Sequence, residues 1–179
     1  MNTVNQTTGM KVDMNEAQSE FLKTEFFILS WDAASQHNKI WKNPIGKADF
    51  KMQIKAFLEN ELLKDYGKRK VREEEHITNI EKLQAKTKEL GNALNFGTCQ
   101  KLLNMMCKYY WCIGLIKEQP PLLPVDRINL QNAGIKDCNW TQIEDKNEYK
   151  SIIDKIRKKA GSQSLAEWEI VNWKRKLYR

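Results

Sequence analysis

The chain has 179 residues, of which 41% are hydrophobic and 30% are charged, with only four prolines and eight glycines. This composition excludes a disordered chain, and the length suits one domain with its own core better than two. The net charge of +7 is concentrated at one end, because residues 146–179 carry ten Lys or Arg against four Asp or Glu. A basic end on a balanced body indicates an anionic partner, most often nucleic acid, although lysines that only solvate two helices would give the same count.

The spacing of apolar residues predicts an all-α fold of six or seven helices in a single compact domain. Residues 1–15 are polar and have no period, so they are expected to form a flexible N-terminal arm, and residues 16–179 are expected to form the helical domain. The first three helices are predicted at residues 16–38, 49–66 and 68–90, because prolines and glycines interrupt the apolar pattern between them.

The stretch from residue 97 to 130 is the one around which the chain is organised. It begins with a helix that has a buried apolar face and a second, partly polar face formed by Lys101, Asn104, Lys108 and Trp111. Three prolines then fix a rigid, non-helical crossing: Pro120, Pro121 and Pro124. Asp126 follows and is placed to cap the next short helix with its side chain.

Two more helices are predicted near the C-terminus. Asp145 and Ser164 each precede a glutamate by three residues, which is the spacing of a capping box at a helix start. The first of these helices is expected to end at Gly161, and the second is expected to bury side chains as far as Leu177. No stretch alternates apolar and polar residues clearly enough to predict a strand.

Several kinds of site have no counterpart in this sequence. It contains neither of the glycine-rich motifs that cradle nucleotide phosphates. Its four cysteines lack the CxxC spacing, and its two histidines, His37 and His76, lie far apart, so we expect no bound metal and no cofactor. His76 follows three glutamates on a highly charged helix, and it is expected to be solvated.

The sequence also predicts where the protein resides. No apolar run reaches the eighteen or so residues of a membrane span, and no signal-peptide core follows the N-terminus. Free cysteines are typical of a reducing compartment. We therefore expect a cytoplasmic, nucleoid-associated protein with no membrane partner, acting as a monomer.

The central stretch resembles the core of the helix-hairpin-helix DNA glycosylases at Gly97, Lys101 and the sequence Pro124-Val125-Asp126. In that superfamily a glycine-containing turn opens a helix that carries a lysine nucleophile in the bifunctional members. A Val-Asp element follows twenty to thirty residues later, and here 25 residues separate Lys101 from Asp126. The prolines before the aspartate are most similar to the archaeal 8-oxoguanine glycosylase branch. The hairpin departs from the family pattern, since residues 95–98 hold one glycine where two are common.

This resemblance implies a DNA glycosylase, with or without lyase activity, that acts on a damaged or modified base in double-stranded DNA. Lys101 would be the nucleophile and Asp126 the catalytic carboxylate, which stabilises positive charge on the sugar. A lysine attacks only when it is neutral, so Lys101 would need burial to lower its pKa.

The target base must leave the stack, and aromatic side chains are suited to receive it. Candidates for that pocket are Trp31, Asn38, Trp41 and Trp140. Candidates for contacts with the DNA backbone are the basic residues Lys155, Lys158, Lys159, Lys174 and Arg175.

Two other functions fit the same sequence. A non-catalytic helical module could use the basic C-terminal region to bind nucleic acid, with Asp126 as a plain helix cap and Lys101 as a solvent lysine. A protein-binding inhibitor or adaptor could use exposed tryptophans as interface anchors. The distinguishing feature is a cleft in which the Lys101 amine faces the Asp126 carboxylate, because only the enzyme needs it.

Overall fold

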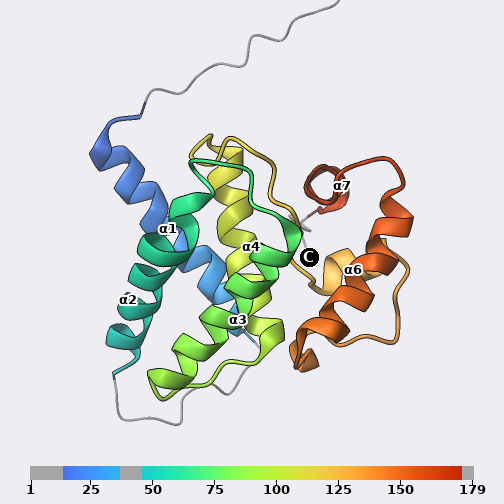
Figure 1. The fold of residues 1–179 in the computed structure, drawn as a ribbon, viewed down its shortest axis with the longest axis horizontal. Coiled ribbons are helices and arrows are strands. Elements are labelled where there is room, and N and C mark those ends of the chain that lie inside the picture. The colour runs from blue at the N-terminus through green and yellow to red at the C-terminus, as the bar shows by residue number, and fades with distance from the viewer. Residues whose placement is uncertain (1–13, 37–45, 175–179) are drawn as a thin grey trace, which may run out of the picture.

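The computed structural model describes residues 14–36 and 46–174, and within these ranges every regular element is helical, which confirms the predicted all-α fold (Figure 1). The α-helices are α1 (Glu16–Ser35), α2 (Lys47–Phe57), α3 (Glu73–Glu89), α4 (Phe96–Cys112), α5 (Arg127–Asn132), α6 (Lys146–Ala160) and α7 (Leu165–Asn172). Shorter turns are η1 (Leu58–Leu62), η2 (Leu63–Asp65) and η3 (Trp140–Gln142). None of the described helices is long and apolar enough to cross a membrane.

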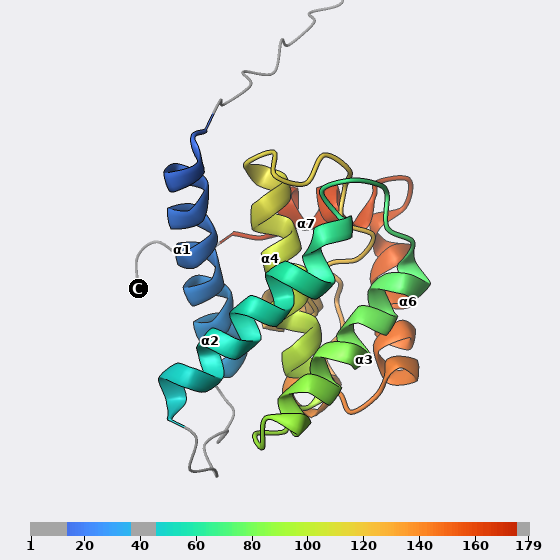
Figure 2. The same cartoon turned by 60° about the vertical axis from the view of Figure 1, so that its left-hand side comes forward.

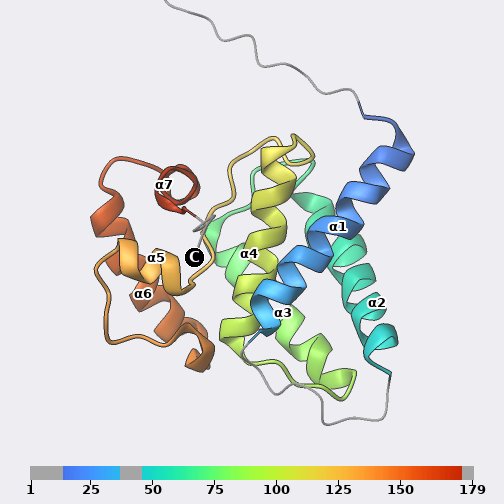
Figure 3. The ribbon, with the colours of Figure 1, turned by 180° about the vertical axis from the view of Figure 1, so that it is seen from behind.

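Helix α4 lies in the middle of the molecule, with α1 and α2 on one side of it and α5, α6 and α7 on the other (Figures 1 and 3). Every residue from 96 to 107 is buried, so α4 has no solvent-facing stripe over its first three turns. The partly polar face predicted for this helix is therefore buried as well, and its polar side chains must find partners inside the protein.

Most predicted element boundaries agree with the structure. Helix α1 begins at Glu16 as expected, and the predicted break after it lies in residues 37–45, outside the described residues. Helix α2 continues through η1 and η2 almost to the predicted end. Asp145 and Ser164 cap α6 and α7 by accepting backbone N–H bonds. Leu177 lies outside the described residues.

Helix α3 begins at Glu73, later than the predicted residue 68, because the preceding residues form a turn. The carbonyl of Asp65 accepts the backbone N–H groups of residues 68 and 69, at 3.0 Å each. The guanidinium of Arg69 then bridges the carboxylates of Asp65 and Glu75. This clamp holds the chain in a turn that a helical pattern of apolar residues does not reveal.

His76 is fully buried, so the prediction that it is solvated is wrong. Its Nε2 lies 3.0 Å from the amide oxygen of Asn104 and its Nδ1 lies 2.7 Å from the Tyr66 hydroxyl. Because an amide oxygen only accepts, Nε2 carries the proton and Nδ1 accepts from Tyr66. Asn104 donates in turn to the Tyr149 hydroxyl at 3.0 Å, so a neutral histidine joins α3, α4 and α6. The three glutamates before His76 are exposed or partly exposed. They suggested that the helix is solvated on every side, but His76 lies on its buried side.

Burial lowers the pKa of His76 to about 4 from an ordinary value of 6.5. The unfolded chain therefore binds a proton at a higher pH than the folded protein, and stability falls as the pH drops through the window between these values. We expect the free energy of unfolding to fall by about 2 kcal/mol more in the parent protein than in His76→Gln between about pH 7 and about pH 5. Urea unfolding at the two pH values measures this, and equal losses in both proteins would contradict it.

Candidate active site

Lys101 is buried in the second turn of α4, with 8% of its surface exposed. Its amine lies 4.0 Å from the centroid of the Trp140 ring, which gives it a cation–π contact. Among residues 14–36 and 46–174, no group forms a hydrogen bond or ion pair with this amine. Burial lowers the pKa of Lys101, and the negative charge of Asp126 opposes that effect. The lysine is therefore shielded from water, close to a carboxylate and not neutralised by contact with it.

Gly97 brings the Trp140 segment close to Lys101. The backbone N–H of Gly97 donates to the carbonyl of Ile143 at 2.8 Å, and a Cβ at position 97 would collide with the carbonyl oxygen of Trp140. Only glycine permits this approach of η3 to the first turn of α4. The single glycine in residues 95–98 thus positions an aromatic ring over the lysine.

Asp126 caps α5 as predicted, and both of its carboxylate oxygens accept hydrogen bonds. Oδ1 accepts from the backbone N–H of Asn129 at 2.8 Å, and Oδ2 accepts from the indole Nε1 of Trp173 at 3.2 Å. The residue is 7% exposed. Each oxygen keeps a further lone pair, so the carboxylate is oriented by the protein and can still interact with a substrate.

Gln100 sets the position of Asp126 relative to Lys101. Its side-chain amide donates to the carbonyl of Val125 at 2.8 Å, and its amide oxygen accepts from the backbone N–H of the same residue at 3.0 Å. Gln100 is fully buried. These two hydrogen bonds fix the segment before Asp126 to the helix that carries Lys101, and the charge of Asp126 acts on the Lys101 amine. The adjacent Pro124 stiffens the loop.

A buried ion pair between Lys108 and Glu169 lies near Asp126. The Lys108 amine donates to a carboxylate oxygen of Glu169 at 2.6 Å, and the Asn129 side chain donates to the same oxygen at 3.4 Å. Glu169 is 1% exposed, and burial raises its pKa while the Lys108 charge opposes the increase. The charge of Asp126 contributes to the increase, so Glu169 belongs to the same electrostatic cluster.

Glu169 was not identified from the sequence. Its one signal is its position, four residues after Leu165 and next to Trp168, both of which are buried on the inner face of α7. A glutamate at that spacing faces inward and needs a partner.

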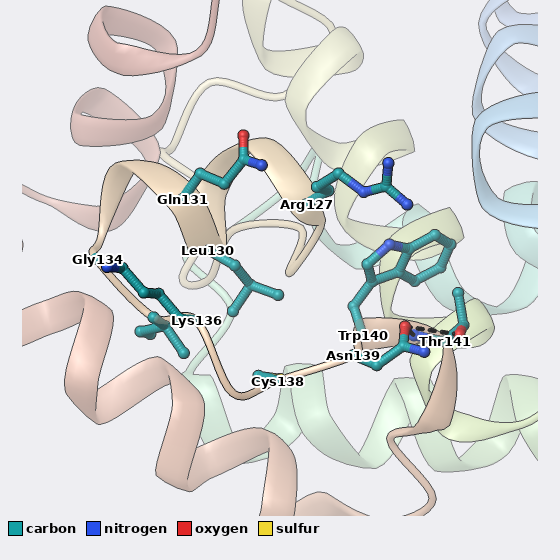
Figure 4. A pocket seen from close by; sticks show the side chains of 10 residues that line it. Arg127, Leu130, Gln131, Gly134, Lys136, Cys138, Asn139, Trp140 and Thr141 are labelled. Atoms are coloured by element: carbon teal, nitrogen blue, oxygen red, sulfur yellow. Dashed lines mark hydrogen bonds between the residues drawn. The ribbon is translucent and has the colours of Figure 1, made fainter.

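A pocket of about 730 Å³ opens beside Trp140 and Arg127 (Figure 4). It lies between α5, the loop after it and η3. Its apolar surface includes Leu130, Ile135, Cys138 and Trp140, and its polar surface consists of Arg127, Gln131, Lys136, Asn139 and Thr141. Trp140 both lines this pocket and contacts the Lys101 amine, so its ring connects the two, although neither Lys101 nor Asp126 lines the pocket.

The structure divides the predicted pocket residues. Trp140 lies at the cluster, as just described. Trp31 does not: it is 2% exposed and its ring packs on Phe27 and Phe50, with centroids 5.9 Å away in each case. The prediction that Trp31 receives a base is therefore corrected to a packing role between α1 and α2. Asn38 and Trp41 lie outside the described residues.

The basic residues of α6 fall into two groups. Three of them pair with acidic residues of α3, which lies beside α6 (Figure 2): Lys146 with Glu81, Lys150 with Glu74, and Arg157 with Glu73, at 2.7–3.0 Å. The predicted backbone contacts Lys155, Lys158 and Lys159 are exposed, and no carboxylate among the described residues lies in ion-pair distance of them. Lys174 is also exposed, and Arg175 lies outside the described residues.

Lys155 acts electrostatically on Cys138, which lies in the loop after α5. Burial raises the pKa of the Cys138 thiol, as does the charge of Glu148, and the charge of Lys155 opposes them. Cys138 lines the pocket. No group of three His, Cys, Asp or Glu in the described ranges is placed to hold a metal ion.

This arrangement can perform nucleophilic chemistry at an electrophilic carbon. A lysine with a lowered pKa is neutral for a larger fraction of the time, and Asp126 can stabilise positive charge that develops nearby. Trp140 and the pocket offer a surface for a flat, partly polar group. Comparisons of the chain with protein-family models, with curated proteins and with solved structures find no match.

Proposed function

We propose that this protein is a DNA glycosylase with an associated lyase step, which excises a modified base from double-stranded DNA. The observation that carries the proposal is the Lys101 amine, which is buried within electrostatic range of Asp126 and has no hydrogen-bond or ion-pair partner in the described residues. Its aromatic neighbour Trp140 lines an open pocket, although Lys101 and Asp126 themselves do not. A buried lysine without a partner is costly for stability, and a nucleophile is a role that accounts for the cost.

In the proposed reaction the lone pair of the Lys101 amine attacks C1′ of the deoxyribose. The glycosidic bond breaks, its electron pair leaves with the base, and the base takes up a proton. Opening of the sugar ring then gives an imine between Lys101 and C1′, with loss of a proton from the amine. Removal of a proton from C2′ expels the 3′-phosphate and nicks the strand. The Asp126 carboxylate would stabilise the positive charge on the sugar during the first step.

The proposed DNA-binding surface contains the exposed lysines of α6 and Lys174. They would neutralise backbone phosphates, while the target nucleotide leaves the stack and enters the pocket. The lysines that pair with α3 are already neutralised, so fewer contacts are available than the net charge of the sequence implies.

Duplex DNA binding should weaken steeply with salt, since each neutralised phosphate contributes about 0.9 to the slope of log affinity against log salt. Replacing Lys155, Lys158 and Lys174 together by glutamine should lower this slope by up to about 2.7. Fluorescence anisotropy at several salt concentrations measures it. Glutamine at Lys146 and Lys150, which pair with α3, is the matched control and should change the slope much less. If the DNA affinity of the parent protein does not change with salt concentration, DNA is not the partner.

The proposal itself is tested with a panel of oligonucleotides and phage DNAs that carry different modified bases, scored for abasic sites and strand nicks. Release of at least one modified base is the expected result. Salt-dependent DNA binding without release of any base would instead favour the non-catalytic binding module.

A further inference from the structure

We infer that the pocket beside Trp140 receives a base that carries a bulky, oxygen-rich substituent. This inference rests on the proposed glycosylase function and specifies its substrate class. A single pyrimidine or purine ring would leave most of a pocket of about 730 Å³ empty. Pockets of this volume bind ligands of drug size. Such a ligand packs against the apolar walls and forms hydrogen bonds with a few polar groups.

The position of the pocket directs the base into it. The Lys101 amine contacts the ring of Trp140, and Trp140 lines the pocket. Arg127 also lines the pocket (Figure 4), and it directly follows Asp126 in the sequence. A nucleotide whose sugar reaches Lys101 would have to pass Trp140, and its base would then lie in this space beside Arg127.

The polar lining specifies the substituent. Arg127 and Lys136 only donate hydrogen bonds, Gln131, Asn139 and Thr141 both donate and accept, and no aspartate or glutamate is among the described residues that line the pocket. Such a surface matches a group whose outer atoms are hydrogen-bond acceptors. A sugar attached to the base and an acidic group attached to it share that chemistry, whereas a hydrocarbon group of the same size lacks it.

The test compares four duplexes that differ at one pyrimidine: uracil, 5-carboxylcytosine, glucosylated 5-hydroxymethylcytosine, and a pyrimidine with a cyclohexylmethyl group of similar bulk. The inference expects release of the glucosylated base to exceed release of uracil and of the cyclohexylmethyl base by at least about tenfold in kcat/KM, because bonds to charged donors are lost in the others. Release of 5-carboxylcytosine at a comparable rate would identify the acceptor atoms that both groups share as the recognised feature. Faster release would identify the negative charge, and slower release would identify the sugar.

Lys136→Ala removes one donor from an exposed position that is not needed for packing. It should lower release of the glucosylated base about tenfold more than it lowers release of uracil. Lys88→Ala, at an exposed lysine of α3, is the control. Equal release of all four bases, or release of uracil alone, would overturn the inference and leave the glycosylase proposal intact. Weaker binding of every duplex by Lys136→Ala would also overturn it, because the pocket would then hold a backbone phosphate. If no duplex, including the phage DNAs, gives base release or an imine, both this inference and the glycosylase proposal are wrong.

Discussion

Lys101→Gln is expected to abolish covalent trapping of the protein on substrate DNA by borohydride. Trapping requires an imine between the Lys101 amine and C1′, and glutamine keeps the length of the side chain without a nucleophile. Removing the unpaired buried amine relieves its desolvation cost, so the variant should be less stable than the parent by no more than about 1 kcal/mol, the scale of the lost contact with Trp140. DNA binding should persist, and gel electrophoresis of the reduced mixture detects the covalent complex.

Lys101→Arg provides a second variant that retains the positive charge over Trp140 but cannot form the imine. It should also fail to trap. If base release survives in both variants while trapping is lost, the enzyme would be monofunctional, with water activated at Asp126. If trapping survives in both, Lys101 is not the nucleophile.

Lys108 lies on the same face of the helix as Lys101, but it is unsuitable as a control for this experiment. Lys108 pairs with the buried carboxylate of Glu169 at 2.6 Å, and removing one partner of a buried pair costs about 3–5 kcal/mol. Lys88→Gln is the better control, since Lys88 is exposed in the last turn of α3 and lies outside the cluster. Its trapping should equal that of the parent protein.

Asp126→Asn is expected to reduce base release by at least about 100-fold, because the carboxylate charge that stabilises the sugar cation is removed. The asparagine oxygen can still accept from the backbone N–H of Asn129 and cap α5. Its amide nitrogen cannot accept from the Trp173 indole, so one hydrogen bond is lost at a cost of about 1 kcal/mol. Single-turnover kinetics and urea unfolding together separate the two effects.

Trp173→Phe is the matched control for Asp126→Asn. It removes the same indole hydrogen bond but leaves the carboxylate charge, so it should reproduce the loss of stability without the full loss of activity. Base release by Asp126→Asn at the parent rate would reduce Asp126 to a structural cap.

Local sequence patterns were sufficient for much of this protein. The apolar spacing predicted an all-α fold, and helix ends were set by side chains within four residues of the groups they satisfy, as at Asp126, Asp145 and Ser164. Caps are local, so their chemistry is visible without a fold. The burial of Lys101 could not be predicted from the local sequence. Its helix shows an apolar face in sequence, but only the packing of elements on all sides of α4 makes its polar face buried as well.

The tertiary structure decided everything that depends on contacts between distant segments. Gln100 forms a hydrogen bond with Val125, and Lys108 forms an ion pair with Glu169. Trp140 contacts Lys101 because Gly97 lets η3 approach α4. The same holds for His76, which is surrounded by charge in sequence but bonded to Asn104 in space. A buried polar side chain requires a hydrogen-bond or ion-pair partner. The partner cannot be identified from the sequence, because only the packing of the helices determines which groups come into contact.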